Sequence, residues 1–153
     1  MCGIFGGVGV TSEEASLCIK AIRRGNDGIS VSQFGDVIMA ARRHLVKNSV
    51  KTNVQEGKSD QPYISNDGRV QLVFNGELYN FAEIREDLFN NGMSFETEGD
   101  TEVFLKLYEY EGKNFVKNKK IDSLFSLAIH DQNTNELIIT RDWPGRIPLF
   151  YYY

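Results

Sequence analysis

The sequence predicts an α+β fold in which antiparallel sheets carry helices on their outer faces. Strands, helices and then strands again follow one another along the chain, an order typical of helices segregated from strands. Short turns rich in Gly and Asn join neighbouring strands, which favours antiparallel pairing. With 153 residues, of which 41% are hydrophobic, the chain fits one globular domain.

The first part of the chain predicts a strand, a helix and a hairpin. Residues 3–10 (GIFGGVGV) form the expected strand. Thr11 and Glu14 then have the spacing of a capping box, which marks the start of a helix. Residues 29–34 and 36–41 are expected to pair as a hairpin around a central Gly.

The middle of the chain begins with a polar segment, residues 47–59, which lacks periodicity and is typical of a functional loop. Asn66-Asp67-Gly68 is a strong hairpin signal that leads into the strand Val70–Phe74. Asn75-Gly76 is expected to end this strand, because the pair favours a tight turn.

Two helices are expected next. The first follows Asn80, whose side chain can cap it with Glu83 three residues later, and ends near Gly92. The second spans Thr101–Glu111, with Asp100 as its expected N-cap.

The last part of the chain predicts another hairpin, formed by residues 123–131 and 136–141. Residues 148–153 (PLFYYY) are aromatic and expected to be extended. We find no internal repeat or low-complexity segment in the sequence.

Charge and cysteine content exclude several classes of function. The net charge of −4 argues against a protein that neutralises nucleic-acid phosphates over a broad face. No apolar run approaches the roughly 20 residues of a membrane span. Cys2 and Cys18 are too few for a disulfide framework, so a cytoplasmic location is expected, with Cys18 packing along the first helix.

Cys2 has a special chemistry because it directly follows the initiator Met. Once the Met is removed, a thiol of pKa about 8.5 and an α-amine of pKa about 7.7–8.0 belong to one residue. The amine can accept the thiol proton, directly or through water, so nucleophile and base need no separate histidine. A residue at this position can equally be an incidental small side chain, and the surrounding motifs decide between these interpretations.

Six motifs in register resemble those of class II glutamine amidotransferases, the N-terminal-nucleophile family that releases ammonia from glutamine, and most closely the glutaminase domain of asparagine synthetases. They run across nearly the whole chain, which makes the resemblance specific. The matching segments are Met1-Cys2-Gly3-Ile4-Phe5-Gly6, Arg24-Gly25-Asn26-Asp27-Gly28, Asp60-Gln61-Pro62, Asn75-Gly76-Glu77-Leu78-Tyr79-Asn80, Gly99-Asp100-Thr101-Glu102-Val103 and residues 141–151 (RDWPGRIPLFY).

The resemblance implies a catalytic role for three residues. Cys2 would be the nucleophile, while the Asn75 side-chain amide and the Gly76 backbone N–H would stabilise the oxyanion. Arg43 aligns best with the family's arginine for the glutamine α-carboxylate, with Arg42 as its rival. If this segment is a strand, the two arginines point to opposite faces, so one of them can enter the pocket.

The resemblance also implies an acidic contact for the α-ammonium group of glutamine. Asp100 matches the family's residue for this contact, although it is also a plausible helix cap. Glu77 is a weaker candidate, and orienting the turn at residues 75–80 is an equally good interpretation of it.

The implied fold is the four-layer α/β/β/α arrangement of N-terminal-nucleophile hydrolases, with residues 1–153 as a single amidotransferase domain. Family members continue into further strands and an ATP-using synthetase domain, and the sequence contains neither. Glutamine is therefore the expected substrate, a separate synthetase subunit the expected ammonia acceptor, and no metal or organic cofactor is expected. The alternative is a non-catalytic glutamine-binding or assembly module that retains the pocket.

Overall fold

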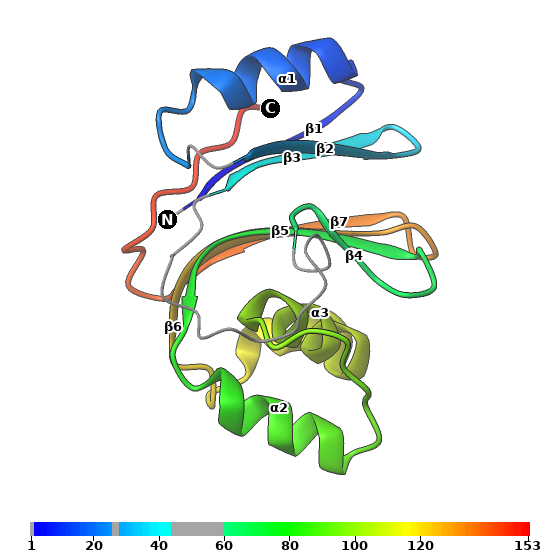
Figure 1. Ribbon diagram of the computed structural model, residues 1–153, viewed down its shortest axis with the longest axis vertical. Helices are drawn as coiled ribbons and strands as arrows, with labels where there is room; N and C mark the ends of the chain where they lie inside the picture. The colour runs from blue at the N-terminus through cyan, green and yellow to red at the C-terminus, as the bar shows by residue number, and fades with distance from the viewer. Residues whose placement is uncertain (1, 26–27, 44–59) are drawn as a thin grey trace.

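The computed structural model describes residues 2–25, 28–43 and 60–153. Two antiparallel sheets stack face to face and carry helices on both outer sides (Figure 1). The first sheet has the order β1-β3-β2 and consists of Gly3–Val8 (β1), Gly28–Phe34 (β2) and Val37–Arg43 (β3). The second has the order β4-β5-β6-β7 and consists of Tyr63–Ile64 (β4), Val70–Leu78 (β5), Ser123–Asp131 (β6) and Glu136–Arg141 (β7).

The helices form the two outer layers. Ser12–Ala21 (α1) covers the first sheet, and the second sheet is covered by Phe81–Asn90 (α2), Asp100–Glu111 (α3) and the short 3₁₀ helix Gly112–Lys117 (η1) (Figure 1). This arrangement confirms the α+β fold class predicted from the sequence and the four layers that the family resemblance implies.

Side chains alternate between the two faces of β3 and thereby connect three layers. Met39 and Ala41 pack between the sheets against Val73 of β5 and Ala128 of β6. Ile38, on the opposite face of β3, is fully buried on the side that α1 covers. This alternation decides which polar residues at the end of β3 face the second sheet.

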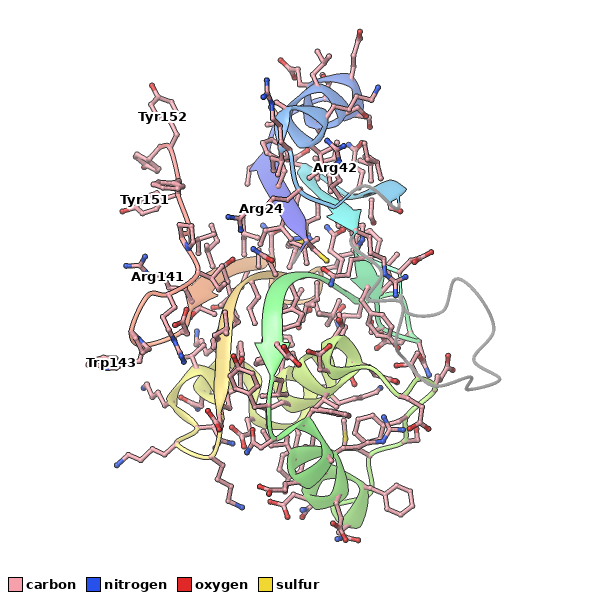
Figure 2. The ribbon with its side chains drawn as sticks, turned by 60° about the vertical axis from the view of Figure 1, so that its left-hand side comes forward. Arg24, Arg42, Arg141, Trp143, Tyr151 and Tyr152 are labelled. Atoms are coloured by element: carbon pink, nitrogen blue, oxygen red, sulfur yellow. The ribbon has the colours of Figure 1, made fainter. Side chains whose placement is uncertain are left out.

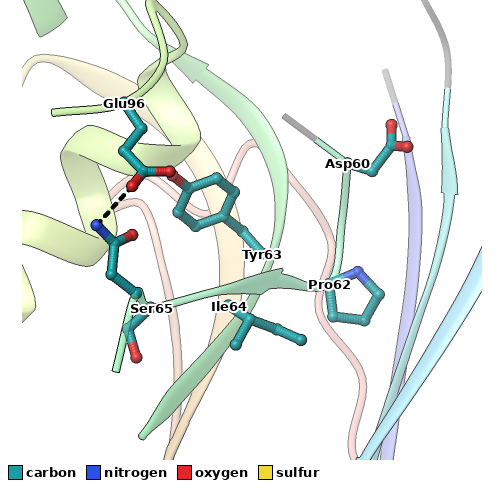
Figure 3. A pocket seen from close by; sticks show the side chains of 7 residues that line it. Asp60, Pro62, Tyr63, Ile64, Ser65 and Glu96 are labelled. Atoms are coloured by element: carbon teal, nitrogen blue, oxygen red, sulfur yellow. Dashed lines mark hydrogen bonds between the residues drawn. The ribbon is translucent and has the colours of Figure 1, made fainter. Parts of the chain in front are cut away.

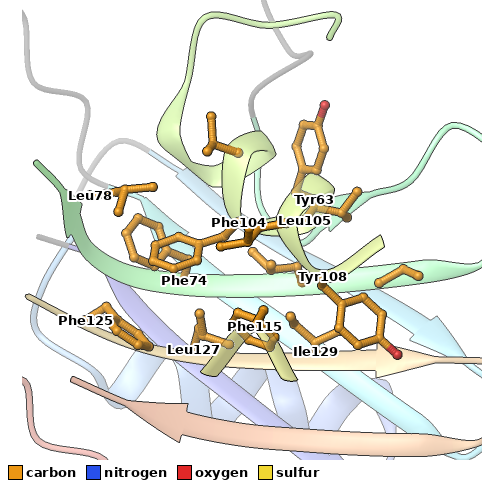
Figure 4. Close-up of a cluster of buried hydrophobic side chains, with 14 of the residues drawn as sticks. Tyr63, Phe74, Leu78, Phe104, Leu105, Tyr108, Phe115, Phe125, Leu127 and Ile129 are labelled. Atoms are coloured by element: carbon orange, nitrogen blue, oxygen red, sulfur yellow. The ribbon is translucent and has the colours of Figure 1, made fainter. Parts of the chain in front are cut away.

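The larger hydrophobic core lies between the second sheet and its helices (Figure 4). The ring of Phe104 on α3 lies 5.1 Å from that of Phe74 on β5 and 5.2 Å from that of Phe125 on β6. These spacings are within the range in which tilted aromatic pairs attract each other. The core therefore fixes α3 against the strand that carries Asn75 and Gly76.

Several local predictions are confirmed. Thr11 and Glu14 form the capping box at the start of α1, with the Glu14 N–H donating to Thr11 Oγ1 at 3.2 Å. The two hairpin strands around Gly35 pair in the predicted order. The predicted strands 123–131 and 136–141 match β6 and β7.

The prediction that Asn75-Gly76 ends its strand is wrong. β5 continues to Leu78, with Asn75 opposite Ser126 and Gly76 opposite Phe125. The pairing with β6 extends the strand through a dipeptide that favours turns in isolation.

Two predicted helix caps are also wrong. Asn80 makes no side-chain cap for α2, and instead its amide donates to the Lys120 carbonyl at 2.7 Å and its Oδ1 accepts from the Asp122 N–H at 3.0 Å. Asp100 is the first residue of α3, and Gly99 is the N-cap. Each side chain bonds to backbone far away in the sequence: Asn80 to residues 120 and 122, and Asp100 to the Leu78 N–H.

The C-terminal segment belongs to no helix or strand after Arg141. Figure 2 shows Trp143, Tyr151 and Tyr152 projecting away from the body of the protein. Cys18, expected to pack, is exposed on α1. The predicted loop at 47–59 lies outside the described residues. Within the described ranges, every helix is too short or too polar to cross a membrane.

Candidate active site

Strand alternation directs Asn75 and Arg43 into the space between the two sheets. Val73 on β5 packs in the inter-sheet cluster, so Asn75, two residues later, has its side chain on the same face. Ala41 on β3 places Arg43 there by the same argument. Because β5 lies against β1 and β3, these side chains share one interior region.

Cys2 lies immediately before the start of β1, which is an edge strand next to β3. It directly precedes Gly3, which pairs with Arg42. Ile4 packs against the inter-sheet cluster, so an extended chain places Cys2 on the same side. Cys2 is a free cysteine and is half-buried.

The two neighbouring arginines serve different elements. Arg42 points toward α1, where its Nε donates to the Gly25 carbonyl at 2.6 Å and its Nη1 to those of Ile22 and Lys20 at 2.7 and 3.0 Å. Arg43 forms an ion pair with Asp60 instead. The sequence prediction that they point to opposite faces is therefore confirmed, and whether Arg43 binds substrate stays a prediction.

Asn75 carries an unsatisfied polar atom. Its side chain is 8% exposed, and its Oδ1 is buried without a hydrogen-bond partner among the described residues. A buried acceptor without a partner costs about 1–3 kcal/mol in stability. Because this atom is an acceptor, a ligand or a water molecule that donates to it would satisfy it.

Gly76 is required by its surroundings. Its φ is +152°, and a Cβ at this position would collide with the Leu124 carbonyl oxygen and lie 2.7 Å from Phe125 Cα. Both atoms belong to the β6 backbone and cannot move aside. Only glycine allows β5 and β6 to approach this closely.

The backbone N–H of Gly76 points toward the edge of β5 that faces away from β6. The N–H groups of Phe74 and Leu78 point toward this edge, because alternate residues of a strand direct their N–H groups the same way. The Gln61 Oε1 accepts from Phe74 at 2.6 Å and the Asp100 Oδ2 accepts from Leu78 at 3.2 Å. Beyond β4, side chains thus replace a neighbouring strand on both sides of Gly76.

Asp100 lies in an environment that disfavours its charge. Burial raises the pKa of its carboxyl above the ordinary 3.8, and the negative charge of Glu77 adds to this effect, while hydrogen bonds from the Leu78 and Thr101 N–H groups oppose it. Glu77 itself is exposed. The structure thus brings the two predicted acidic residues close together, with Asp100 the more enclosed of them.

The segment before β4 contributes two residues, Asp60 and Gln61, for which the sequence predicts no role in the site. Asp60 pairs with Arg43 from the first sheet, and Gln61 bonds both β5 and α3, where its Nε2 lies 3.5 Å from Thr101 Oγ1. The motif Asp60-Gln61-Pro62 is one of the six segments that carry the family resemblance. Its local sequence carries no signal for these contacts.

A cleft of about 480 Å³ lies beside this segment (Figure 3). Two of its lining residues are joined by a hydrogen bond of 2.9 Å, which the Asn66 amide donates to the Glu96 carboxylate. The cleft shares Asp60 with the arrangement above, but the predicted site residues do not line it. The lining residues are Asp60, Pro62, Tyr63, Ile64, Ser65, Asn66 and Glu96.

We find no cluster of three or more His, Cys, Asp or Glu side chains suited to a metal ion in residues 2–25, 28–43 and 60–153. The chemistry available at the site is that of a thiol, an amide, a guanidinium group and carboxylates.

The whole chain, residues 1–153, matches the family model of the glutamine amidotransferase domain. The chain belongs to this family, which confirms the resemblance drawn from the six motifs.

The particular relatives are asparagine synthetases. The chain is 34% identical over 160 residues to asparagine synthetase [glutamine-hydrolyzing] 2 of Bacillus subtilis (strain 168), covering 99% of this chain and 20% of the relative. It is 31% identical over 157 residues to the nodule asparagine synthetase [glutamine-hydrolyzing] of Pisum sativum, covering 98% and 25% of the two chains. The chain therefore spans a fifth to a quarter of the length of these relatives.

A solved structure supports the fold. Glutamine phosphoribosylpyrophosphate amidotransferase from B. subtilis, complexed with ADP and GMP, superposes with a TM-score of 0.51 at 23% identity, covering 69% of this chain and 23% of the other. This likeness, together with the four layers, confirms the predicted fold of N-terminal-nucleophile hydrolases.

Proposed function

We propose that this chain hydrolyses glutamine to glutamate and ammonia, with Cys2 as the nucleophile and residues 1–153 acting as one amidotransferase domain. The proposal is supported by strand register, which directs the side chains of Cys2, Arg43 and Asn75 to the space between the sheets, beside the N–H of Gly76. Membership of the glutamine amidotransferase domain family supports the same reaction.

The reaction begins with the Cys2 thiolate attacking the side-chain carbonyl carbon of glutamine. The α-amine of Cys2, exposed by removal of the initiator Met, takes the thiol proton and returns it to the leaving nitrogen. Ammonia departs as the carbonyl reforms, which leaves a γ-glutamyl thioester on Cys2. Water then attacks the thioester, releasing glutamate and regenerating the thiol.

Two donors stabilise the negative charge that develops on the carbonyl oxygen. The Asn75 amide supplies one from the inter-sheet face, and the Gly76 N–H supplies the other from the strand edge. Because the strands β5 and β6 hold both residues rigidly, the donors need no reorganisation as the charge forms.

Substrate recognition uses the charged groups around these donors. Arg43 binds the α-carboxylate of glutamine, for which its guanidinium must exchange or share its ion pair with Asp60. Asp100 and Glu77 provide the negative side of the site for the α-ammonium group. This division selects a free amino acid over a peptide-bound glutamine.

The similarity to asparagine synthetases suggests that a synthetase uses the ammonia released by this chain. We propose that a separate synthetase subunit receives it in the cytoplasm, since free ammonia is mostly protonated near neutral pH and then non-nucleophilic. Cys2 and Cys18 are both free thiols, which suits a reducing compartment.

Ammonia release from glutamine tests the proposal, using protein whose intact mass shows that Met1 is absent. Cys2→Ala is expected to abolish turnover while the fold and part of the glutamine affinity remain. Cys2→Ser is expected to retain little activity, because a hydroxyl is a much weaker nucleophile at neutral pH. Cys18→Ala, which removes an exposed thiol on α1, is the matched control and is expected to keep the wild-type rate.

Two outcomes would contradict the proposal. Ammonia release by Cys2→Ala at the wild-type rate would exclude Cys2 as the nucleophile. Glutamine binding without turnover in processed wild-type protein would instead favour the non-catalytic glutamine-binding module.

A further inference from the structure

At the edge of β5 that faces away from β6, the backbone N–H of Gly76 lies between two N–H groups that have side-chain acceptors. β4 pairs with β5 opposite Leu72 and reaches no further along the strand. The next N–H groups toward this edge belong to Phe74, Gly76 and Leu78. Gln61 and Asp100 accept from the first and the last of these, so the Gly76 N–H lies between two occupied positions.

Gln61 is a buried residue that makes hydrogen bonds at this edge of β5. Its side chain is 8% exposed. Its Oε1 accepts from the Phe74 N–H at 2.6 Å, and its Nε2 donates to Thr101 Oγ1 at 3.5 Å. One amide therefore bridges the residue before Asn75 and the residue after Asp100.

We propose that Gln61 is a positioning residue for glutamine hydrolysis: it fixes the β5 edge so that Asn75 and Gly76 donate to the oxyanion. This inference rests on the proposed function. Gln61 itself need not touch glutamine, because it acts through the Phe74 N–H, the amide adjacent to Asn75 in the chain.

The physical reason lies in what would happen without this side chain. The Phe74 N–H would lose its acceptor at an edge where no strand of the described residues pairs beside it, and a buried, unpaired N–H is costly. The backbone around Asn75 would shift to find water or another acceptor. Oxyanion stabilisation is sensitive to such shifts because its donors must already be in place when the charge forms.

The position of Gln61 also affects Asp60, which contacts the other sheet. Asp60 is the residue before Gln61 and pairs with Arg43 on the other sheet. The hydrogen bonds of Gln61 therefore also hold Asp60 in place, and Asp60 contacts the guanidinium group that we predict to bind the substrate carboxylate. The side chain of Gln61 is linked to both halves of the site.

Steady-state glutaminase kinetics of Gln61→Met test the inference, because Met has a similar length but neither donor nor acceptor in the positions of the amide. We expect kcat to fall by roughly 10- to 100-fold, the scale of a small misplacement of reacting groups, with a smaller change in KM. Gln61→Asn is the second variant. Its shorter side chain cannot reach Phe74, so the same loss is expected in a polar background that preserves folding.

Gln71→Met is the matched control. Gln71 is also a fully buried glutamine and lies on β5 itself, but its amide points to the Val37 carbonyl at 3.4 Å, away from the β5 edge. We expect this variant to lose stability while keeping kcat. The ¹⁵N-resolved amide signals of Phe74 and Gly76 provide a readout without turnover, and are expected to move in the Gln61 variants and stay in place in Gln71→Met.

The outcomes separate this inference from the proposed function. A wild-type protein that releases no ammonia would overturn the proposed function, and this inference with it. An active wild type together with unchanged kcat in Gln61→Asn or Gln61→Met would overturn the positioning role alone. Equal losses of kcat in the Gln61 and Gln71 variants would also overturn it, since they would indicate general destabilisation.

Discussion

Arg42 and Arg43 are adjacent in the sequence and bind opposite layers of the protein. Arg42 joins β3 to the end of α1 through three backbone carbonyl oxygens, whereas Arg43 reaches Asp60 on the side of the second sheet. The pleat of one strand thus directs two adjacent guanidinium groups to opposite faces of the first sheet.

Alanine substitutions should separate these two functions. Arg43→Ala is expected to raise the KM for glutamine strongly, since losing one side of a buried charge-assisted pair costs about 2–5 kcal/mol. Arg42→Ala is expected to leave KM nearly unchanged and to lower the free energy of unfolding by about 2–3 kcal/mol, because it removes charged hydrogen bonds to backbone. Steady-state kinetics and urea unfolding of both variants give the comparison. The reverse pattern would mean that the substrate carboxylate binds on the α1 side.

Gly76→Ala should damage both stability and activity, because the added methyl group meets the β6 backbone. We expect the free energy of unfolding to fall by about 3 kcal/mol or more, the upper range for overpacking in a rigid setting. Gly35→Ala is the matched control: Gly35 also has a positive φ, of +58°, but open space around it. A similar loss in both variants would show that backbone conformation, and not the close approach of β6, is the constraint at Gly76.

Local sequence determines the features that depend on few residues. The capping box of Thr11 and Glu14 and the hairpin turn at Asn66-Asp67-Gly68 are complete within a few positions, and the structure contains both. The opposite directions of Arg42 and Arg43 follow from the period of a strand alone. These features could be predicted because neighbours in the chain decide them.

The features that could not be predicted depend on distant partners. Gln61 bonds residues that are 13 and 40 positions away, so no local pattern marks it. Asn80 looks like a helix cap, yet it bonds residues 120 and 122. The strand β5 runs through Asn75-Gly76 because β6 pairs with it, which overrides a dipeptide that favours turns.

Asp100→Asn should change the pH dependence of stability. Because burial raises the pKa of Asp100 in the folded protein, its contribution to stability is fully present below the ordinary value of 3.8 and is lost as pH rises through the higher folded value. Asn retains an acceptor for the Leu78 N–H without a buried charge. We therefore expect the variant to be at least as stable as wild type at pH 7, with a higher KM for glutamine.

Asp67→Asn provides a control of opposite sign. Hydrogen bonds from the Ser65 hydroxyl and the Arg69 N–H lower the pKa of Asp67, so its stabilising contribution is present above the ordinary value and lost as pH falls. Thermal unfolding between pH 3 and 8 should show the two variants diverging from wild type in opposite directions. Parallel shifts would contradict the raised pKa of Asp100.

Asn75→Ala should separate catalysis from stability. The developing oxyanion exists in the transition state, so losing one preorganised donor is expected to lower kcat by about 10²–10³-fold with a modest change in KM. Because Asn75 Oδ1 is buried without a partner among the described residues, its removal should cost little stability. Asn75→Asp should be at least as inactive, since a carboxylate repels the oxyanion.

Single-turnover measurements at saturating glutamine, with the thioester trapped by acid quench, follow the chemical step in these variants directly. Ser126→Ala is the control, because Ser126 lies opposite Asn75 on β6 and is also buried; it should keep the wild-type rate of thioester formation. If Asn75→Ala instead raised KM with kcat intact, Asn75 would position the substrate, and the second oxyanion donor would have to be another group near the Gly76 N–H. A large loss of stability in Asn75→Ala would mean that the carboxamide is satisfied within the folded protein, and that its role is structural.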